Sequence, residues 1–419
     1  KPRKCCIFKT EEKITAQGGL ALFGEFIIAI GLKEIVERFF PKPGSGRGFT
    51  AYEYIFVLLL MEHSGGRHLE DIRKIATDEG LKKVLGIKRV PTPDAVGDWL
   101  RRQGIRGSKL IEAVNRKIVK WYLERGNRKE YTLDIDATVI EGEKKEACYT
   151  YKGVKGYLPI IGHLAENGLV VNYEFRKGNE TPSLKNLEFY RSCKSAIGKD
   201  KLIKNFRADS ASYQRELIDE LERDGVGYAI GGRVDDAVKE AIRTIPKERY
   251  KEYKEAKIGE TYHIMNKSKN AFRLIVLKRM TQGLLFEEEE LRYFTLASNR
   301  EESAEETLNY YHQRGEHSEN RIKELKIDFM VERLPCGQFE ANAMYFGIVV
   351  LAYNLYKIFV GMVLPKSFYK RRAITVRYYI YNVAARVVTT ARQVYLKVEK
   401  TVYELFENIR MRISLIRDG

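Results

Sequence analysis

Residues 131–140, YTLDIDATVI, decide the fold. They are rich in apolar and β-branched residues, and the character of the side chains alternates with a period of two. This pattern predicts a β-strand. Two more strands are expected at 157–165 and 169–175. Asn167 and Gly168 lie between them, and Asn-Gly is the strongest short signal for a tight hairpin. The region therefore begins as a group of hairpin strands.

Helices and strands alternate after this hairpin. The apolar spacing predicts a helix at 184–196, a strand at 202–208, a helix at 213–223 and a strand at 227–230. Hairpin strands followed by alternating helices and strands are typical of an α/β fold with a mixed sheet, in contrast to a doubly wound parallel sheet.

Residues 235–290 interrupt this alternation. They begin with a charged helical stretch, continue with β-like segments at 260–265 and 271–279, and end in the acidic run 287–290. We interpret 235–290 as an insertion of mostly β character. A strand at 292–297 and a long helix follow it.

The two ends of the chain are predicted to be helical. Residues 1–125 carry apolar side chains at helix spacing, and Thr92 followed by Pro93 predicts the start of a helix. A small domain of helix-turn-helix character fits this pattern. The tail 361–419 has 12 Lys and Arg against 4 Asp and Glu. It is expected to be a basic helical surface for a phosphate backbone, with an ordinary solvated helix face as the alternative.

The overall charge narrows the class of partner. The 419 residues carry 74 Lys and Arg against 57 Asp and Glu, a net charge of +17, which favours nucleic acid first and a membrane surface second.

Five cysteines without Cys-x-x-Cys spacing argue against a disulfide framework or a zinc site. The apolar stretch 343–364 is long enough to span a membrane, but Asn354 and Lys357 favour a buried core helix.

Three carboxylate positions could carry chemistry. Asp134 and Asp136 lie two residues apart on the first strand and share a face. Asp209 follows directly on strand 202–208, and Glu319 lies in the long helix. If they converge, they form an oxygen-rich site for Mg²⁺ or Mn²⁺. Spacing alone leaves Asp209 as a helix N-cap and Glu319 as a solvated carboxylate as alternatives.

The string 311–326, YHQRGEHSENRIKELK, resembles the Tyr/Arg/Glu/Lys (YREK) signature of bacterial insertion-sequence DDE transposases. Residues 134–138 resemble their first-aspartate strand, and 206–210, FRADS, the segment with their second aspartate. Residues 339–355 resemble the helix that closes their catalytic domain. The resemblance covers 131–360 well and is closest to the insertion-sequence group numbered thirteen-eighty.

This resemblance implies an RNase H-like mixed α/β sheet with a β-rich insertion and helical N- and C-terminal regions. It implies cut-and-paste DNA transposition with Mg²⁺ as cofactor, for which Mn²⁺ can substitute. Asp136 is preferred to Asp134 as metal ligand because the family's ligand is the aspartate of an Asp-x-Thr string. The expected residues are the catalytic and metal-binding triad Asp136, Asp209 and Glu319, and the DNA-phosphate contacts Tyr311, Arg314 and Lys326, to which the tail adds Arg371 and Arg372.

The resemblance also sets the expected organisation and partners. The partners would be double-stranded DNA at the transposon ends and the target, and a second copy of the chain as a DNA-bound homodimer, in a bacterial cytosol near the nucleoid and without a membrane. The expected division is a helical DNA-binding domain at 1–125, a catalytic domain at 126–234 and 291–362, a β insertion at 235–290, and a basic helical region at 363–419.

The chain departs from the family pattern in one place. Four residues separate Arg314 from Glu319 where the family has three. In a regular helix, this spacing would turn the two side chains about 140° apart. We therefore predict a one-residue bulge within 315–318, since such bulges tend to occur at functional sites. Without it, Glu316 becomes a candidate third ligand, and His317 is a weaker candidate for acid–base chemistry.

Three other functions stay open at this point. A catalytically silent DNA-binding protein derived from a transposase would keep the fold without cutting. A metal-dependent nuclease would cut without strand transfer. A membrane-associated protein would use 343–364 and the basic tail.

Overall fold

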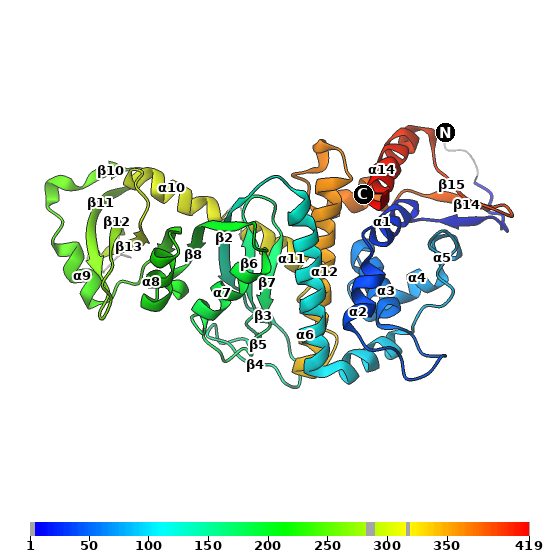
Figure 1. The fold of residues 1–419 in the computed structure, drawn as a ribbon, viewed down its shortest axis with the longest axis horizontal. Coiled ribbons are helices and arrows are strands. Elements are labelled where there is room, and N and C mark those ends of the chain that lie inside the picture. Colours follow the sequence, from blue (N-terminus) through cyan, green and yellow to red (C-terminus); the bar gives the residue numbers. More distant parts are fainter. Residues whose placement is uncertain (1–4, 282–289, 316–318, 419) are drawn as a thin grey trace. The chain divides into compact units, whose positions relative to one another are not determined.

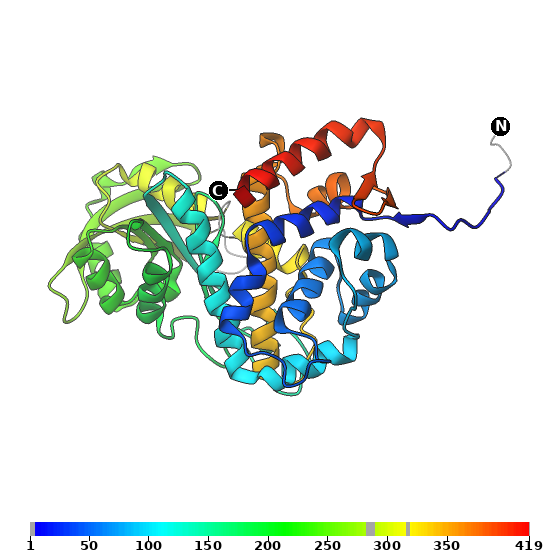
Figure 2. The same cartoon turned by 45° about the vertical axis from the view of Figure 1, so that its right-hand side comes forward.

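The computed structural model describes residues 5–281, 290–315 and 319–418 (Figure 1). Contacts within the chain divide it into two compact units. The helical unit comprises 1–114 and 324–419, and the sheet unit comprises 115–323. Figure 2 shows the same elements from a second direction.

The sheet unit is built on one nine-stranded mixed sheet. The central strand β2 pairs in parallel with β8 on one side and antiparallel with β6 on the other, and β9 continues the parallel part. This arrangement confirms the predicted mixed sheet. In order across the sheet the strands are β10 (Lys251–Tyr253), β11 (Ala256–Ile264), β12 (Ala271–Thr281), β13 (Glu290–Ser298), β9 (Gly227–Gly231), β8 (Leu202–Ala208), β2 (Glu130–Ala137), β6 (Ile160–Leu164) and β7 (Val170–Glu174).

The predicted hairpin lies between β6 and β7. Gly168 has φ +78°, a left-handed conformation that glycine adopts without a steric cost. The side-chain oxygen of Asn167 accepts a hydrogen bond from the backbone N–H of Leu169 at 3.0 Å. Asn167 and Gly168 therefore form part of the turn that the sequence predicts at this position.

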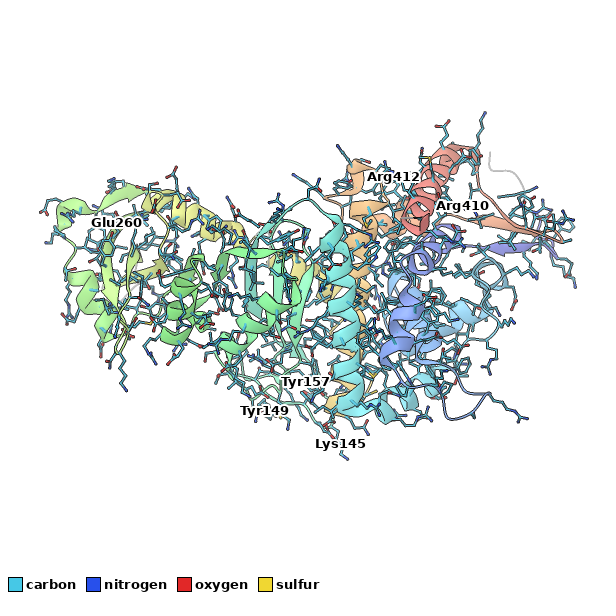
Figure 3. The ribbon with its side chains drawn as sticks, in the orientation of Figure 1. Lys145, Tyr149, Tyr157, Glu260, Arg410 and Arg412 are labelled. Carbon is cyan, nitrogen blue, oxygen red and sulfur yellow. The ribbon has the colours of Figure 1, made fainter. Side chains whose placement is uncertain are left out.

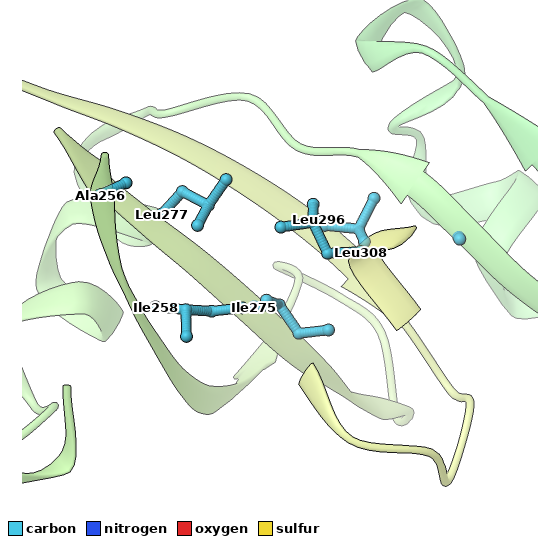
Figure 4. Close-up of a cluster of buried hydrophobic side chains, with 7 residues drawn as sticks. Ala256, Ile258, Ile275, Leu277, Leu296 and Leu308 are labelled. Atoms are coloured by element: carbon cyan, nitrogen blue, oxygen red, sulfur yellow. The ribbon is translucent and has the colours of Figure 1, made fainter. Parts of the chain in front are cut away.

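The insertion joins the main sheet. Its strands β10, β11 and β12 pair in sequence with β13, and β13 meets β9 through Leu296–Ser298. Helix α9 (Asp236–Arg243) precedes these strands. Their apolar face forms a buried cluster with α10 (Ala304–Arg314), drawn in Figure 4. Of the acidic run 287–290, only Glu290 lies within the described residues.

Smaller elements complete the sheet unit. Helices α7 (Asn186–Ala196) and α8 (Arg215–Arg223) lie close to the predicted ranges. A separate three-stranded sheet follows β2, where β5 pairs with both β3 and β4. Figure 3 labels Lys145, Tyr149 and Tyr157 in this part of the chain. Its strands are β3 (Ile140–Glu141), β4 (Cys148–Tyr149) and β5 (Lys155–Tyr157).

The helical unit is built around apolar helices. The predicted start at Thr92 is confirmed, because its hydroxyl accepts a hydrogen bond from the N–H of Ala95 at 3.2 Å. Its helices are α1 (Gly18–Ala29), α2 (Leu32–Phe39), α3 (Ala51–Ser64), α4 (Ile72–Thr77), α5 (Glu79–Leu85), α12 (Phe339–Met362), α13 (Ala373–Val376) and α14 (Lys400–Asp418), while α6 (Pro93–Arg125) and α11 (Asn320–Ile327) cross into the sheet unit.

Helix α12 contains the predicted apolar stretch. Among the described residues it is the one helix long and apolar enough to cross a membrane, and 94% of its most apolar window is buried inside the protein. Asn354 is fully buried. This burial is typical of a core helix, which Asn354 and Lys357 favoured over a membrane span.

The tail is helical at α13 and α14 but also contains two strands that the helical prediction missed. β14 (Ala385–Thr389) and β15 (Val394–Lys397) pair with each other, and β14 pairs with β1 (Lys13–Thr15). The partner of β14 lies near the opposite end of the chain. A local pattern therefore could not have identified it.

Candidate active site

Strand β2 carries the two aspartates of the first motif into different surroundings. Asp134 is fully buried, and both of its oxygens accept hydrogen bonds from Arg207, at 2.7 and 2.8 Å. The parallel register places these two residues opposite each other on β2 and β8. A buried carboxylate needs such a bidentate partner. Asp134 is therefore committed to a structural ion pair.

Asp136 lies one residue before the end of β2, where its side chain is 15% exposed. Asp209 follows directly on β8. The last register pair of these parallel strands is Ile135 with Ala208, so Asp136 and Asp209 come next on adjacent strands. Parallel strands place their carboxyl ends at one edge of the sheet, where α/β folds place their functional groups.

Asp209 also caps a short turn. Its Oδ1 accepts a hydrogen bond from the N–H of Ala211 at 3.0 Å, at the start of the 3-10 turn Ser210–Ser212. Asp209 therefore caps this turn and not the following helix, because α8 begins at Arg215 after its N-cap residue Gln214. The hydrogen bond orients the carboxyl group at the strand end.

Helix α10 brings two of the signature residues, Tyr311 and Arg314, close to Asp136. It begins with a capping box of Ser303 and Glu306. Arg314, at its end, is 8% exposed, and its Nη2 lies 3.1 Å from Oδ2 of Asp136. Gly315 and Glu319 have π-helical conformation. The bulge predicted within 315–318 stays a prediction, because Glu316, His317 and Ser318 lie outside the described residues.

The charges of this group act on one another. Burial raises the pKa of Asp136 to about 6; Arg314 opposes the rise, while the negative charges of Asp209, Glu319 and Asp134 add to it. Burial acts against the charged form of Arg314, yet the neighbouring carboxylates outweigh it and raise its pKa. The two aspartates, Glu319 and Arg314 therefore form one electrostatic cluster.

Tyr311 completes the cluster. Its ring lies 5.8 Å from that of Phe294, and burial together with the nearby carboxylates raises its pKa. A Cβ on Gly231 would lie 3.0 Å from the Tyr311 hydroxyl and 3.1 Å from the Ser210 nitrogen. Gly231, which has no side chain, thus allows α10 to approach the end of β9.

The whole chain matches one family of proteins. Residues 4–417 match the family model described as Transposase DDE domain group 1. The chain belongs to this family. The large mixed sheet, its β-rich extension and the flanking helical regions are consistent with that membership.

The transposase also resembles solved structures. One is a cryo-EM structure of the piggyBac transposase synaptic complex with hairpin DNA, 13% identical, with a TM-score of 0.44 over 98% of this chain and 84% of that chain. No curated protein sequence matches the chain.

The donor chemistry of the cluster suits a hard divalent ion, because carboxylate oxygens are what Mg²⁺ and Mn²⁺ prefer. In the described parts of the transposase, no three acidic, histidine or cysteine side chains lie together in a way that could hold a metal ion. Asp136 is instead paired with Arg314. The residue types therefore suit a metal ion, but in this structure the side chains are arranged as an ion-paired cluster.

The remaining predicted DNA contacts of the transposase belong to the helical unit. Lys326 forms an ion pair with Glu332 at 3.2 Å. Arg371 is exposed, while Arg372 donates two hydrogen bonds to the buried carboxylate of Asp328. Arg372 therefore has a structural partner that the sequence did not reveal.

Arg207 is the site residue that sequence reasoning missed. A signal was present, because an arginine within the otherwise apolar end of strand 202–208 implies a buried partner. Arg207 also donates to the backbone oxygen of Tyr310 at 2.9 Å, which ties β8 to α10. His163 is buried in β6, and His312 is exposed on α10, in line with structural or surface roles.

Proposed function

We propose that this transposase binds the terminal inverted repeats of an insertion sequence, cuts the DNA there and joins the freed ends to target DNA. The observation that carries the proposal is the cluster around Asp136, where Arg314 pairs with it and the charges of Asp209 and Glu319 act on it. The signature around 311–326 supports assignment to the YREK transposases of group thirteen-eighty.

Asp136, Asp209 and Glu319 are the residues that would hold the metal ions. When bound, two Mg²⁺ or Mn²⁺ ions stabilise the attacking and leaving oxygens of an in-line phosphoryl displacement. The protein contributes by positioning, because β2 and β8 present the two aspartates at one sheet edge. Arg314 offers a guanidinium for a DNA phosphate, and Tyr311 a hydroxyl.

DNA binding is assigned to the helical unit and the basic tail, with Lys326, Arg371 and Arg372 as phosphate contacts. A homodimer bridging two transposon ends in the bacterial cytosol is part of the same proposal. The excess of 8 positive charges in 361–419 supports an electrostatic contribution to binding.

The test is cleavage of DNA that carries the element's own flanking repeats, with Mg²⁺, Mn²⁺ or EDTA. Asp136→Asn and Glu319→Gln are each expected to reduce cutting by at least about a hundredfold while DNA affinity stays nearly unchanged, since loss of one transition-state contact has this effect. Glu301→Gln, an exposed carboxylate before α10, is the matched control and should cut normally.

Each other outcome has a distinct meaning. Tight binding without cutting would favour the catalytically silent reading. Cutting without joined products would favour a nuclease. Joint loss of binding and cutting in Asp136→Asn would make Asp136 structural and overturn its assignment.

A further inference from the structure

Two neighbouring tyrosines project from the helical unit. Tyr378 and Tyr379 are 71% and 58% exposed, and their rings lie 5.0 Å apart at an interplanar angle of 85°. Both belong to the π-helical turn Arg377–Tyr381 (η6). An aromatic ring left in water is a large exposed apolar surface, and adjacent exposed rings are typical of binding sites.

Both ends of this turn are fixed by contacts with α3. Arg377 is buried and donates hydrogen bonds to the backbone oxygens of His63, at 2.9 Å, and Glu62, at 2.8 Å, where α3 ends. Ile380 and Tyr381 are also buried, and the Tyr381 hydroxyl lies 3.1 Å from Nδ1 of His63. With the first, fourth and fifth residues of the turn fixed in the core, the second and third are presented outward.

The segment leading into this turn is equally well fixed. The hydroxyl of Tyr356 donates to the backbone oxygen of Arg371 at 2.5 Å. Glu324 accepts a hydrogen bond from the N–H of Ala373 at 3.1 Å, at the start of α13. The tyrosines and the cations before them therefore belong to one ordered segment of the chain, so little conformational entropy would be lost on binding.

The charge of this segment indicates its partner. No Asp or Glu occurs between Glu340 and Glu399, whereas 366–398 contains eight Lys and Arg. Lys366, Lys370 and Arg371 are exposed, as is Tyr369. Basic side chains interleaved with exposed aromatic rings are the combination that binds a phosphate backbone and its bases together.

We propose that residues 366–379 form an aromatic DNA-binding surface, in which the basic side chains contact phosphates and Tyr378 and Tyr379 stack on bases that have left the duplex. This inference rests on the proposed function, because it takes DNA as the partner, and it adds a preference for distorted or unpaired DNA. Stacking is tolerant of sequence, since every base has a π face. The surface would thus act on DNA of any sequence once its bases are exposed.

The experiment compares the full-length wild-type chain with Tyr378→Ala/Tyr379→Ala by fluorescence anisotropy. The probes are a labelled paired duplex and the same duplex with a bulge of unpaired thymines, titrated over a series of salt concentrations. The double variant should lose about tenfold or more in affinity for the bulged duplex and less for the paired one. The salt dependence should be unchanged, because no phosphate contact is removed.

Two matched variants sharpen the result. Tyr378→Phe/Tyr379→Phe keeps the rings and should bind the bulged duplex like the wild type. Tyr262→Ala removes a tyrosine that is 73% exposed on β11 and should have no effect. Equal thermal unfolding midpoints for the variants and the wild type would show that the turn is intact.

Unchanged affinity of the double alanine variant for the bulged duplex would overturn the inference. So would a loss that phenylalanine does not restore, since this would indicate hydroxyl contacts in place of stacking. If the wild-type chain binds neither duplex, the proposed DNA function itself fails. Normal wild-type binding with an unaffected variant removes only the aromatic surface.

Discussion

Single side chains show how the same residue type acquires different roles in this transposase. Asp134 and Asp136 lie two residues apart on β2. Asp134 is buried and forms a bidentate ion pair with Arg207, whereas Asp136 is 15% exposed and pairs with Arg314. The difference follows from depth in the sheet, because Asp136 lies closer to the strand end. Substitution of the two aspartates therefore tests different properties, folding for Asp134 and chemistry for Asp136.

Glu62 provides a second prediction at the residue scale. It is buried at the end of α3, where Oε1 accepts a hydrogen bond from the Tyr345 hydroxyl at 2.6 Å. Burial raises its pKa to about 8, against the opposing effects of Tyr345 and Arg377. The folded chain thus keeps a proton that the unfolded chain releases near pH 4.3, so this residue's contribution to stability falls as the pH rises from about 4.3 through 8.

Glu62→Gln keeps the shape of the protonated side chain and cannot ionise. It should unfold at a higher temperature than the wild type at pH 9 and at a similar temperature at pH 5, as measured by thermal unfolding across this range. Glu301→Gln serves as the exposed control. A constant difference between variant and wild type at all pH values would contradict the assignment.

At the scale of elements, the signature string is divided between α10, which ends at Arg314, and α11, which begins at Asn320. A regular helix would place Arg314 and Glu319 about 140° apart. Gly315 and Glu319 both have π-helical conformation, in which hydrogen bonds join residues five apart. A Cβ on Gly315 would lie 3.9 Å from Oε2 of Glu319, so the Glu319 carboxylate lies close to Gly315.

The contact between β9 and α10 leads to an element-scale prediction. Gly231→Ala places a methyl group 3.0 Å from the Tyr311 hydroxyl and 3.1 Å from the Ser210 nitrogen. Tyr311 must shift, so cleavage should slow, and the free energy of unfolding should fall by about 1–3 kcal/mol. Gly44→Ala is the control, because its added carbon would meet nothing within 4 Å. Normal cleavage by Gly231→Ala would show that the position of Tyr311 is not critical.

At the scale of the whole molecule, positive charge is concentrated in the tail, and some of the charged side chains pair with other groups of the protein. The net charge is +17, but several tail cations have internal partners. Arg410 on α14 pairs with Glu25 at 3.3 Å, and Arg412 donates to the backbone oxygen of Leu364 at 2.9 Å (Figure 3). The tail is therefore a structural part of the helical unit as well as a basic surface.

This distribution predicts different effects for two adjacent arginines. Arg371→Ala should weaken DNA binding and reduce its salt dependence by about one phosphate contact, with no loss of stability. Arg372→Ala should also lower the free energy of unfolding by about 1–3 kcal/mol, because buried Asp328 loses its partner. Anisotropy over about 50 to 200 mM salt and chemical unfolding measure both. An unchanged salt slope for Arg371→Ala would exclude it from the interface.

The sequence by itself determined the elements whose signals are local. Strand 202–208, the Asn167-Gly168 turn and the helix start at Thr92 follow from side-chain alternation, turn preference and capping, each of which involves residues only a few positions apart. The order of these elements was enough to predict the mixed sheet. Of the candidate residues that the resemblance gave, the structure places Asp209, Tyr311, Arg314 and Glu319 near Asp136, whereas Lys326 pairs with Glu332.

The tertiary structure decided every feature that depends on residues distant in the chain. The Asp134–Arg207 pair, the pairing of β14 with β1 and the partner of Arg372 join segments separated by tens to hundreds of residues. The insertion strands likewise joined the main sheet through β13 and β9. Hydrogen bonds and ion pairs of this kind form where the fold brings two groups together and excludes water, and no local pattern records which groups those are.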